Sequence, residues 1–312
     1  MGKFTLPEGI KIGHASDAYT GVTVILADKA VGGVSVRGGA PGTRETDMLR
    51  ADKSQGFVDA VVLSGGSAYG LEASCGVVEY LRERNVGFAV GDKIVPLVAQ
   101  AILYDLNTPG EYHYPDKAMG YAAASAATAE DIEFGSVGAG TGATVGKILG
   151  FEHSCKSGIG GATLFFNDVF VTAVVAVNAL GDVFDHNNGK ILAGARSPIG
   201  TFVNTPKCLT NGLAAHFAAK IDKSAHKNTT IGCVMTNAKL DKAHANKLAE
   251  ISHDGLAMSI RPVHTDADGD TMFALSKGDK EIDYNIVAAL CSEVTALAIE
   301  DAVTRAKKKK AK

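Results

Sequence analysis

Glycine is unusually abundant in this chain, and its abundance limits the folds that the chain can adopt. The sequence has 36 glycines among 312 residues but only 8 prolines, against an average glycine share of about 7%. Because 46% of the residues are hydrophobic, these glycines do not read as flexible linkers. They indicate a packed interior in which segments of backbone approach one another closely.

Short apolar runs alternate with helical repeats along the chain. Residues 22–26 and 60–63 are β-branched apolar runs typical of buried strands. Residues 71–84 carry apolar side chains at helical spacing, and residues 96–106 begin with a proline suited to a first helical turn. Further helices are expected at about residues 209–221, 240–258 and 284–306.

A β-hairpin is predicted in the middle of the chain. Apolar residues 164–166 and 169–171 flank Asn167-Asp168, a pair suited to a tight turn. The second arm stays apolar on both faces up to residue 177, as does the segment 230–235, so both should be central strands. Hairpins with segregated helices indicate a layered α+β fold. No linker divides the 312 residues, so we expect one domain.

Charge and cysteine content exclude several classes of function. The net charge is −3, and the one basic run, residues 307–310, reads as a solvated tail, so no nucleic-acid partner is expected. No run of 18 apolar residues or signal peptide is apparent, which argues against a membrane partner. Five scattered cysteines without C-x-x-C favour a reduced, cytoplasmic protein without zinc or disulfides.

Two glycine-rich stretches resemble nucleotide or hydrolase motifs without completing them. Residues 138–143 match G-x-G-x-x-A, but no acidic residue follows at the required distance, and Ile148 stands where a phosphate loop needs Ser or Thr after Lys147. Ser67 follows a strand and opens a helix, as in a nucleophile elbow, yet the second glycine comes one position late. The alternative role for Ser67 is a helix N-cap.

Acidic residues and histidines give no complete metal site, so no metal or other cofactor is expected. Asp266, Asp268 and Asp270 resemble a calcium loop, but Thr271 and Lys277 occupy positions that should be Gly and Glu. The nine histidines show no ligand spacing. The three acids before an apolar strand therefore remain without a packing explanation.

Read in order, several segments resemble the family of L-aminopeptidase/D-esterases and β-aminopeptidases, which includes the nylon-oligomer hydrolases. The resemblance spans residues 12 to 275, and Thr229 preceded by Asn228 is most similar to the nylon-oligomer hydrolases, since the aminopeptidases commonly carry Ser. The matching segments are IGHASD (12–17), TGVTV (20–24), VRGGAPGTRETD (36–47), LSGGSAYGL (63–71), GAGTGATVGK (138–147), AVNALGD (176–182), TTIG (229–232) and DGD (268–270).

The resemblance implies a four-layer α-β-β-α sandwich of the N-terminal-nucleophile-hydrolase type. It also implies self-cleavage between Asn228 and Thr229 into a large subunit, residues 1–228, and a small subunit, residues 229–312, which stay together and assemble further as a tetramer of such pairs. Thr229 would be the nucleophile, with its new α-amine as the base at neutral pH.

The same resemblance assigns roles to the remaining site residues. Asn178 would donate its amide to the oxyanion, Lys147 would tune the amine, and Asp268 and Asp270 would orient Thr229 and assist cleavage. Tyr104 is a further catalytic candidate by family position, although a buried helix tyrosine is the alternative.

The function expected from the sequence is hydrolysis of linear amides, with 6-aminohexanoate (nylon) oligomers as the favoured substrate class. An aminopeptidase acting on short peptides is the close alternative. From another class, ornithine acetyltransferases of the same fold transfer an acyl group to an amine, and a nucleotide-binding protein without enzymatic activity is a third possibility.

Overall fold

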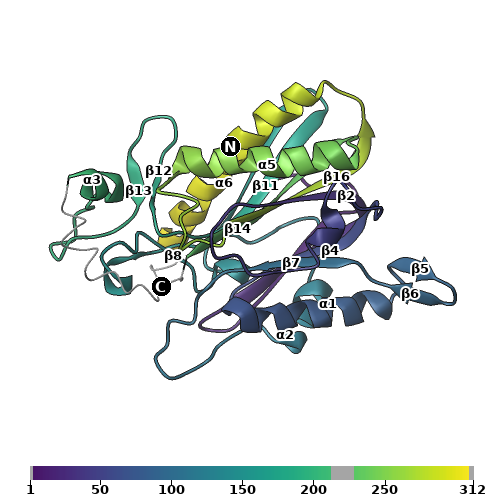
Figure 1. Cartoon of the computed structure of the whole chain (residues 1–312), viewed down its shortest axis with the longest axis horizontal. Coiled ribbons are helices and arrows are strands. Elements are labelled where there is room, and N and C mark those ends of the chain that lie inside the picture. The colour runs from purple at the N-terminus through teal and green to yellow at the C-terminus, as the bar shows by residue number, and fades with distance from the viewer. Residues whose placement is uncertain (1–2, 212–227, 309–312) are drawn as a thin grey trace.

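Two β-sheets stacked face to face form the centre of the molecule, and helices cover the outer face of each (Figure 1). The computed structural model describes residues 3–211 and 228–308. The first sheet contains β1 (Lys11–Ser16), the first half of β2 (Gly21–Val36), β4 (Val58–Ser64), β7 (Val98–Ile102) and β3 (Thr43–Arg44). The second contains β10 (Ile159–Phe166), β11 (Val169–Asn178), β14 (Thr229–Ala238), β16 (Thr271–Lys280) and the second half of β2.

Strand β2 joins the two sheets. Its residues 22–26 pair with β4, and residues 31–36 pair with β16. Between them Asp28 and Lys29 have positive φ angles of 44° and 60° and interrupt the register. This bulge turns the strand from one sheet into the other.

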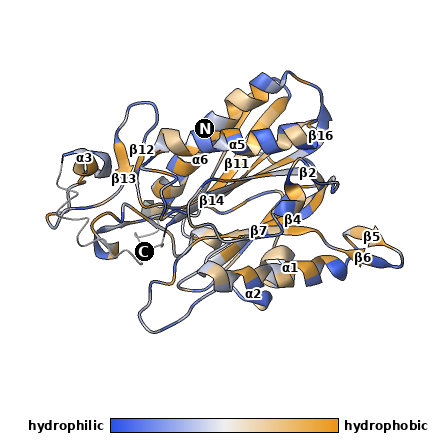
Figure 2. Cartoon of the chain, in the orientation of Figure 1, coloured by the Kyte–Doolittle hydropathy of each residue, from blue (hydrophilic) through white to orange (hydrophobic). Residues whose placement is uncertain are grey.

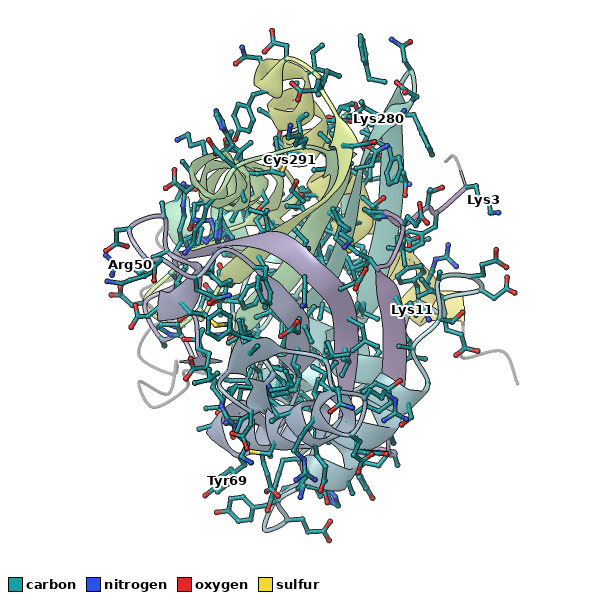
Figure 3. The ribbon with its side chains drawn as sticks, turned by 90° about the vertical axis from the view of Figure 1, so that its right-hand side faces the viewer. Lys3, Lys11, Arg50, Tyr69, Lys280 and Cys291 are labelled. Atoms are coloured by element: carbon teal, nitrogen blue, oxygen red, sulfur yellow. The ribbon has the colours of Figure 1, made fainter. Side chains whose placement is uncertain are left out.

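Helices α1 (Ala73–Arg82) and α2 (Lys117–Ser125) cover the first sheet, whereas α5 (Lys242–Ser259) and α6 (Tyr284–Lys308) cover the second (Figure 1). Figure 3 shows the layers from the side, with Cys291 of α6 in one helical layer and Tyr69 at the opposite edge of the molecule. The remaining elements are η1 (Asp47–Leu49), η2 (Ser67–Glu72), β5 (Phe88–Val90), β6 (Lys93–Val95), η3 (Gly138–Gly140), β8 (Thr144–Val145), η4 (Phe151–His153), β9 (Cys155–Lys156), β12 (Asp182–Phe184), β13 (Ile191–Ala193), α3 (Thr205–Thr210) and β15 (Ile260–Arg261).

Three apolar clusters fill the spaces between these four layers. Leu63 and Phe273 belong to the cluster between the sheets. Val175 and Val294 belong to the cluster under α5 and α6, and Val77 to the one under α1 and α2. Figure 2 shows the corresponding concentration of hydrophobic residues on the central strands. The four-layer α-β-β-α sandwich expected from the sequence is therefore confirmed.

Most predicted elements are present. The strands at 22–26, 60–63 and 230–235 lie within β2, β4 and β14, and the predicted hairpin is β10–β11. Helices predicted at 71–84, 240–258 and 284–306 correspond to α1, α5 and α6.

Two predicted helices do not match a helix of the same extent in the described residues. The helix expected at residues 96–106 is wrong: residues 98–102 form the fully buried strand β7, parallel to β4. Pairing with β4 in the interior of the sheet outweighs the local signal of Pro96. Of the helix expected at 209–221, the beginning overlaps the end of α3, while residues 212–221 lie outside the described residues. Among the described helices, none is both long and apolar enough to cross a membrane.

Candidate active site

Asn178 and Thr229 lie side by side at the ends of two neighbouring strands. Asn178 is the last residue of β11, Thr229 is the first of β14, and their Cα atoms are register partners in this antiparallel pair. Both are buried, with exposed fractions of 0% and 4%. The sheet thus presents a hydroxyl and an amide at one edge of the interior.

The peptide between Asn228 and Thr229 is held by donors on its carbonyl oxygen. The Gly269 N–H donates to the Asn228 carbonyl at 3.0 Å, and the Thr229 hydroxyl donates to the same oxygen. A Cβ at Gly269 would lie only 2.9 Å from Thr229 Oγ1 and 2.7 Å from the Ala40 carbonyl. Glycine is therefore required at 269 so that this backbone can approach the hydroxyl.

Asp268 and Asp270 lie beside this peptide, and each has an exposed fraction of 1%. Asp270 Oδ1 accepts the Thr230 N–H at 2.7 Å. Asp268 Oδ2 accepts the N–H and the hydroxyl of Thr265 at 3.1 and 2.5 Å. Burial and then the charge of Asp270 raise the pKa of Asp268 to about 6. Asp268 can therefore exchange a proton near neutral pH.

Lys147 extends along Asn178. Its Nζ donates to the Asn178 carbonyl at 2.8 Å and to Oδ1 at 2.7 Å. Burial lowers the pKa of Lys147 to about 7, although the charges of Asp268 and Asp105 oppose the shift. An ammonium that loses its proton at this pH is suited to acid–base work.

Hydrogen bonds from three other residues orient the side-chain amide of Asn178. Besides the bond from Lys147 to Oδ1, this oxygen accepts the Thr144 N–H at 3.1 Å, and Nδ2 donates to the Tyr104 carbonyl at 2.8 Å. Tyr104 follows β7 and is half-buried, so it is not a buried helix tyrosine. The contact that it gives to Asn178 comes from its backbone.

Asp105 is a buried residue of this region that the sequence gave no reason to select. It accepts the Gly66 N–H at 2.7 Å and the Thr20 hydroxyl at 2.8 Å. Burial raises its pKa to about 6, against the effect of these two donors and of Lys156. No local pattern could have identified it, because its partners come from segments 39 and 85 residues away.

His264 was also missed. Its backbone N–H and Nδ1 lie 3.1 and 2.8 Å from Asp270 Oδ2. The nine histidines show no metal-ligand spacing, and such spacing does not reveal a hydrogen bond between a histidine and a carboxylate. The close sequence neighbour Asp270 was the one available signal.

Ser67 is not the N-cap that its position suggested. Gly66 occupies the N-cap of η2, with no side-chain capping bond, and Ser67 is the first residue of that helix, with a φ of 52°. The N-cap interpretation is wrong because the turn needs φ of 81° at the cap itself, which glycine adopts without strain.

The 138–143 glycine stretch is used for packing. The Gly138 N–H donates to Ser16 Oγ and the Ala139 N–H to Thr23 Oγ1, at 2.8 and 3.0 Å. A Cβ at Gly138 would lie 2.3 Å from Thr23 Oγ1. These amides are bonded within the chain and do not form an open phosphate cradle.

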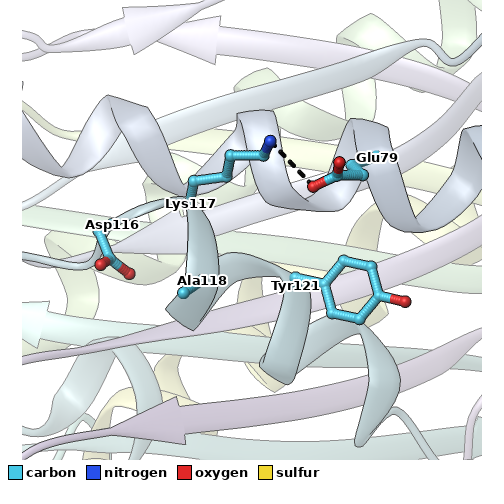
Figure 4. Close-up of a pocket in the computed structure, with 5 residues that line it drawn as sticks. All are labelled: Glu79, Asp116, Lys117, Ala118 and Tyr121. Atoms are coloured by element: carbon cyan, nitrogen blue, oxygen red, sulfur yellow. Dashed lines mark ion pairs between the residues drawn. The ribbon is translucent and has the colours of Figure 1, made fainter.

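Two other features lie away from these strand ends. A hollow on the outer helices α1 and α2 is lined by five residues and crossed by the Lys117–Glu79 ion pair of 3.0 Å (Figure 4). Among the described residues, Asp185, His186 and Glu300 bring three potential metal donors within 4.8 Å of one another. Neither feature includes a residue selected from the sequence.

Comparisons with known proteins agree with the fold and the sequence motifs. The model of peptidase family S58 matches residues 5–311. An uncharacterized aminopeptidase of Mycobacterium tuberculosis is 38% identical over 98% of this chain and 92% of its own length. A 6-aminohexanoate-oligomer endohydrolase of Paenarthrobacter ureafaciens is 32% identical over 94% of this chain and 83% of its own.

Solved structures share the architecture at lower identity. The L-aminopeptidase D-Ala-esterase/amidase of Ochrobactrum anthropi, described as a variant of the Ntn hydrolase fold, superposes with a TM-score of 0.69 at 16% identity, covering 98% of this chain and 87% of that one. The Burkholderia sp. beta-aminopeptidase gives 0.66 at 19%, covering 98% and 86%. The family match over nearly all of its length shows that the chain belongs to peptidase family S58, whose members are hydrolases of amide bonds.

Proposed function

We propose that this enzyme cuts its own chain between Asn228 and Thr229 and then uses Thr229 as an amino-terminal nucleophile on linear amides. The large part would be residues 1–228 and the small part residues 229–312. The observation that carries the proposal is the hydrogen bond from the Thr229 hydroxyl to the Asn228 carbonyl, an oxygen that also accepts the Gly269 N–H.

This geometry supports an internal acyl shift. The Thr229 oxygen adds to the Asn228 carbonyl carbon, the C–N bond breaks, and the nitrogen takes up the hydroxyl proton, which leaves an ester. The Gly269 N–H stabilises the charge that develops on the carbonyl oxygen. Water then hydrolyses the ester, which restores the hydroxyl and frees an α-amine on Thr229 and a carboxylate on Asn228.

The freed α-amine would act as the base in substrate hydrolysis, since amino-terminal groups titrate near pH 7.7–8.0. Asn178 supplies an amide donor next to Thr229 in the sheet, and Lys147 fixes its orientation. Asp268, with its pKa raised to about 6 by burial and the charge of Asp270, would carry protons during cleavage. Asp270 holds the backbone just after the nucleophile.

The favoured substrates are oligomers of 6-aminohexanoate or similar linear amides. The Asn-Thr pair at the cut site and the similarity to a 6-aminohexanoate-oligomer endohydrolase support this class. The second candidate is an aminopeptidase, supported by the higher identity to an uncharacterized aminopeptidase. Assays with a 6-aminohexanoate trimer, an aminoacyl p-nitroanilide and an acetyl-ornithine exchange mixture would separate these activities from acyl transfer.

Three variants test the proposed nucleophile. Thr229→Ala should accumulate as an intact and inactive chain, because the β-hydroxyl is needed both for cleavage and for catalysis. Thr229→Ser should still be cut. Ser67→Ala is the control and should be cut and active, since its hydroxyl has no part in either step.

Denaturing gels and one colorimetric amide assay on each variant give the answer. A Ser67 nucleophile predicts the reverse, with every variant whole and activity lost only in Ser67→Ala. A Thr229→Ala chain that hydrolyses amides at the wild-type rate contradicts the proposal.

A further inference from the structure

Asp270 is bonded through both carboxylate oxygens, and each bond leads to a different part of the site. Oδ1 accepts the N–H of Thr230, the residue after the proposed nucleophile, at 2.7 Å. Oδ2 faces the N–H of His264 at 3.1 Å and its Nδ1 at 2.8 Å. Since a carboxylate can only accept, His264 Nδ1 carries the proton. Asp270 thus connects His264 to the backbone that places Thr229.

His264 adopts an uncommon backbone conformation to make these contacts. Its φ is +56°, in the left-handed region that favours Gly and Asn. Its ring lies against that of His253, with centroids 4.7 Å apart. A non-glycine residue in this conformation is maintained when surrounding contacts determine it, and such residues gather at functional sites.

Several charged and titratable groups surround the His264–Asp270 pair. From α5, His253 faces the Ser35 carbonyl at 3.0 Å through Nε2, and burial lowers its pKa to about 4. After β2, the Arg37 N–H donates to the Asp270 carbonyl at 3.0 Å. Asp268 is the neighbouring carboxyl, and its charge interacts with that of Lys147.

We propose that His264 is a positioning residue for Thr229 and acts through Asp270. By bonding Oδ2 twice, it fixes the carboxylate so that Oδ1 holds the Thr230 N–H and, with it, the start of β14. The inference rests on the proposed self-cleavage at Asn228–Thr229.

Two substitutions separate the imidazole bond from the backbone conformation. Gly and Asn both tolerate the positive φ, but only the Asn side chain can donate from about the position of Nδ1. His264→Asn should therefore be cut at close to the wild-type rate. His264→Gly should be cut about tenfold more slowly, because it loses one hydrogen bond to a charged group.

Recovery of the cleavage rate in His264→Asn is the result that a purely structural role of the imidazole would not give. The Asn side chain restores the donor to Asp270 Oδ2 but not the ring that packs on His253. Melting temperatures monitor folding. Equal slowing of both variants, or a wild-type cleavage rate for His264→Gly, would overturn the inference.

A measurement on an uncut chain covers the case in which His264→Gly does not fold. In Thr229→Ala, nitrogen-resolved NMR of the histidine side chains should show His264 with a proton on Nδ1, and an unprotonated Nδ1 overturns the inference. A wild-type chain that never yields the 84-residue fragment overturns the proposed function along with it. A cut wild type with an unaffected His264→Gly overturns the role of His264 alone.

Discussion

At the scale of single residues, the side chain of Asn178 is held in one orientation by hydrogen bonds at both its oxygen and its nitrogen. Its oxygen accepts bonds from Lys147 and Thr144, and its nitrogen donates to Tyr104. Its position opposite Thr229 follows from the register of β11 on β14. A polar residue that is fully buried in this way has a fixed orientation, which an oxyanion donor requires.

Removal of this amide should slow catalysis more than it weakens substrate binding. We expect Asn178→Ala to lower kcat by about 10²-fold, the usual effect of losing one oxyanion donor. Asn178→Asp is the second variant: it keeps the acceptor for Lys147 but replaces the donor with an oxygen, adds a charge and loses the bond to the Tyr104 carbonyl, so it should be at least as slow. Steady-state kinetics with thermal melts as the folding control would test this. A rise in KM with kcat unchanged would make Asn178 a substrate contact.

At the scale of secondary-structure elements, His186 fastens the β12–β13 hairpin to α6. Its Nδ1 lies 2.5 Å from Glu300 and its Nε2 lies 2.7 Å from Glu293. Only the imidazolium can donate from both nitrogens. Burial by itself lowers the pKa of His186, but the hydrogen bonds and charges of the two glutamates outweigh it and raise the pKa above the ordinary 6.5.

The sign of this shift sets how stability depends on pH. A raised folded-state pKa means that the contribution of His186 is fully present below pH 6.5 and is lost as pH rises through the folded value. His186→Gln should therefore lower the melting temperature most at pH 5–6 and progressively less at alkaline pH. Glu293→Gln is the comparison variant and should lower the melting temperature less, because the Glu293 side chain is 43% exposed. A melting-temperature difference that grows with pH would contradict this assignment.

At the scale of the whole molecule, the two parts that the proposed cut would produce share one continuous sheet. Strands β14 and β16 of the proposed small part lie between β11 and β2 of the large part. Helix α6 packs on the same sheet through the apolar cluster that includes Val175 and Val294. Separation would expose this core and break both strand ladders, so the two parts have no reason to come apart after cleavage.

The cut enzyme should consequently behave as one particle. In a native size-exclusion column the two fragments should elute together, and a denaturing gel of the same fraction should show a small fragment of 84/312 of 32.2 kDa, or about 8.7 kDa. Intact mass should place Thr229 at its amino terminus. Fragments that separate without denaturant would show that the sheet does not hold them, and a small fragment beginning at Thr230 would move the nucleophile by one residue.

The sequence by itself determined the elements whose signal is local. Local patterns predicted the apolar strands β11 and β14, the turn at Asn167-Asp168 and the helix α6 with its apolar stripe. Each of these elements is indicated by the spacing of its own apolar residues or by its own turn residues. The resemblance to a known family added Thr229, Asn178, Lys147, Asp268 and Asp270, and the structure places them together.

Only the tertiary structure decided what depends on distant partners. Residues 98–102 are a strand because β4 pairs with them in the interior, although Pro96 begins the segment like a helix. Asp105 accepts hydrogen bonds from Gly66 and Thr20, which lie far from it in the sequence. His186 contacts two glutamates of a helix that lies 107 to 114 residues further along the chain. A short stretch of sequence contains the spacing of its apolar side chains and its turn-forming residues, so these features can be predicted locally. Burial and the pairing of charges depend on residues far apart in the sequence, which meet only when the layers pack.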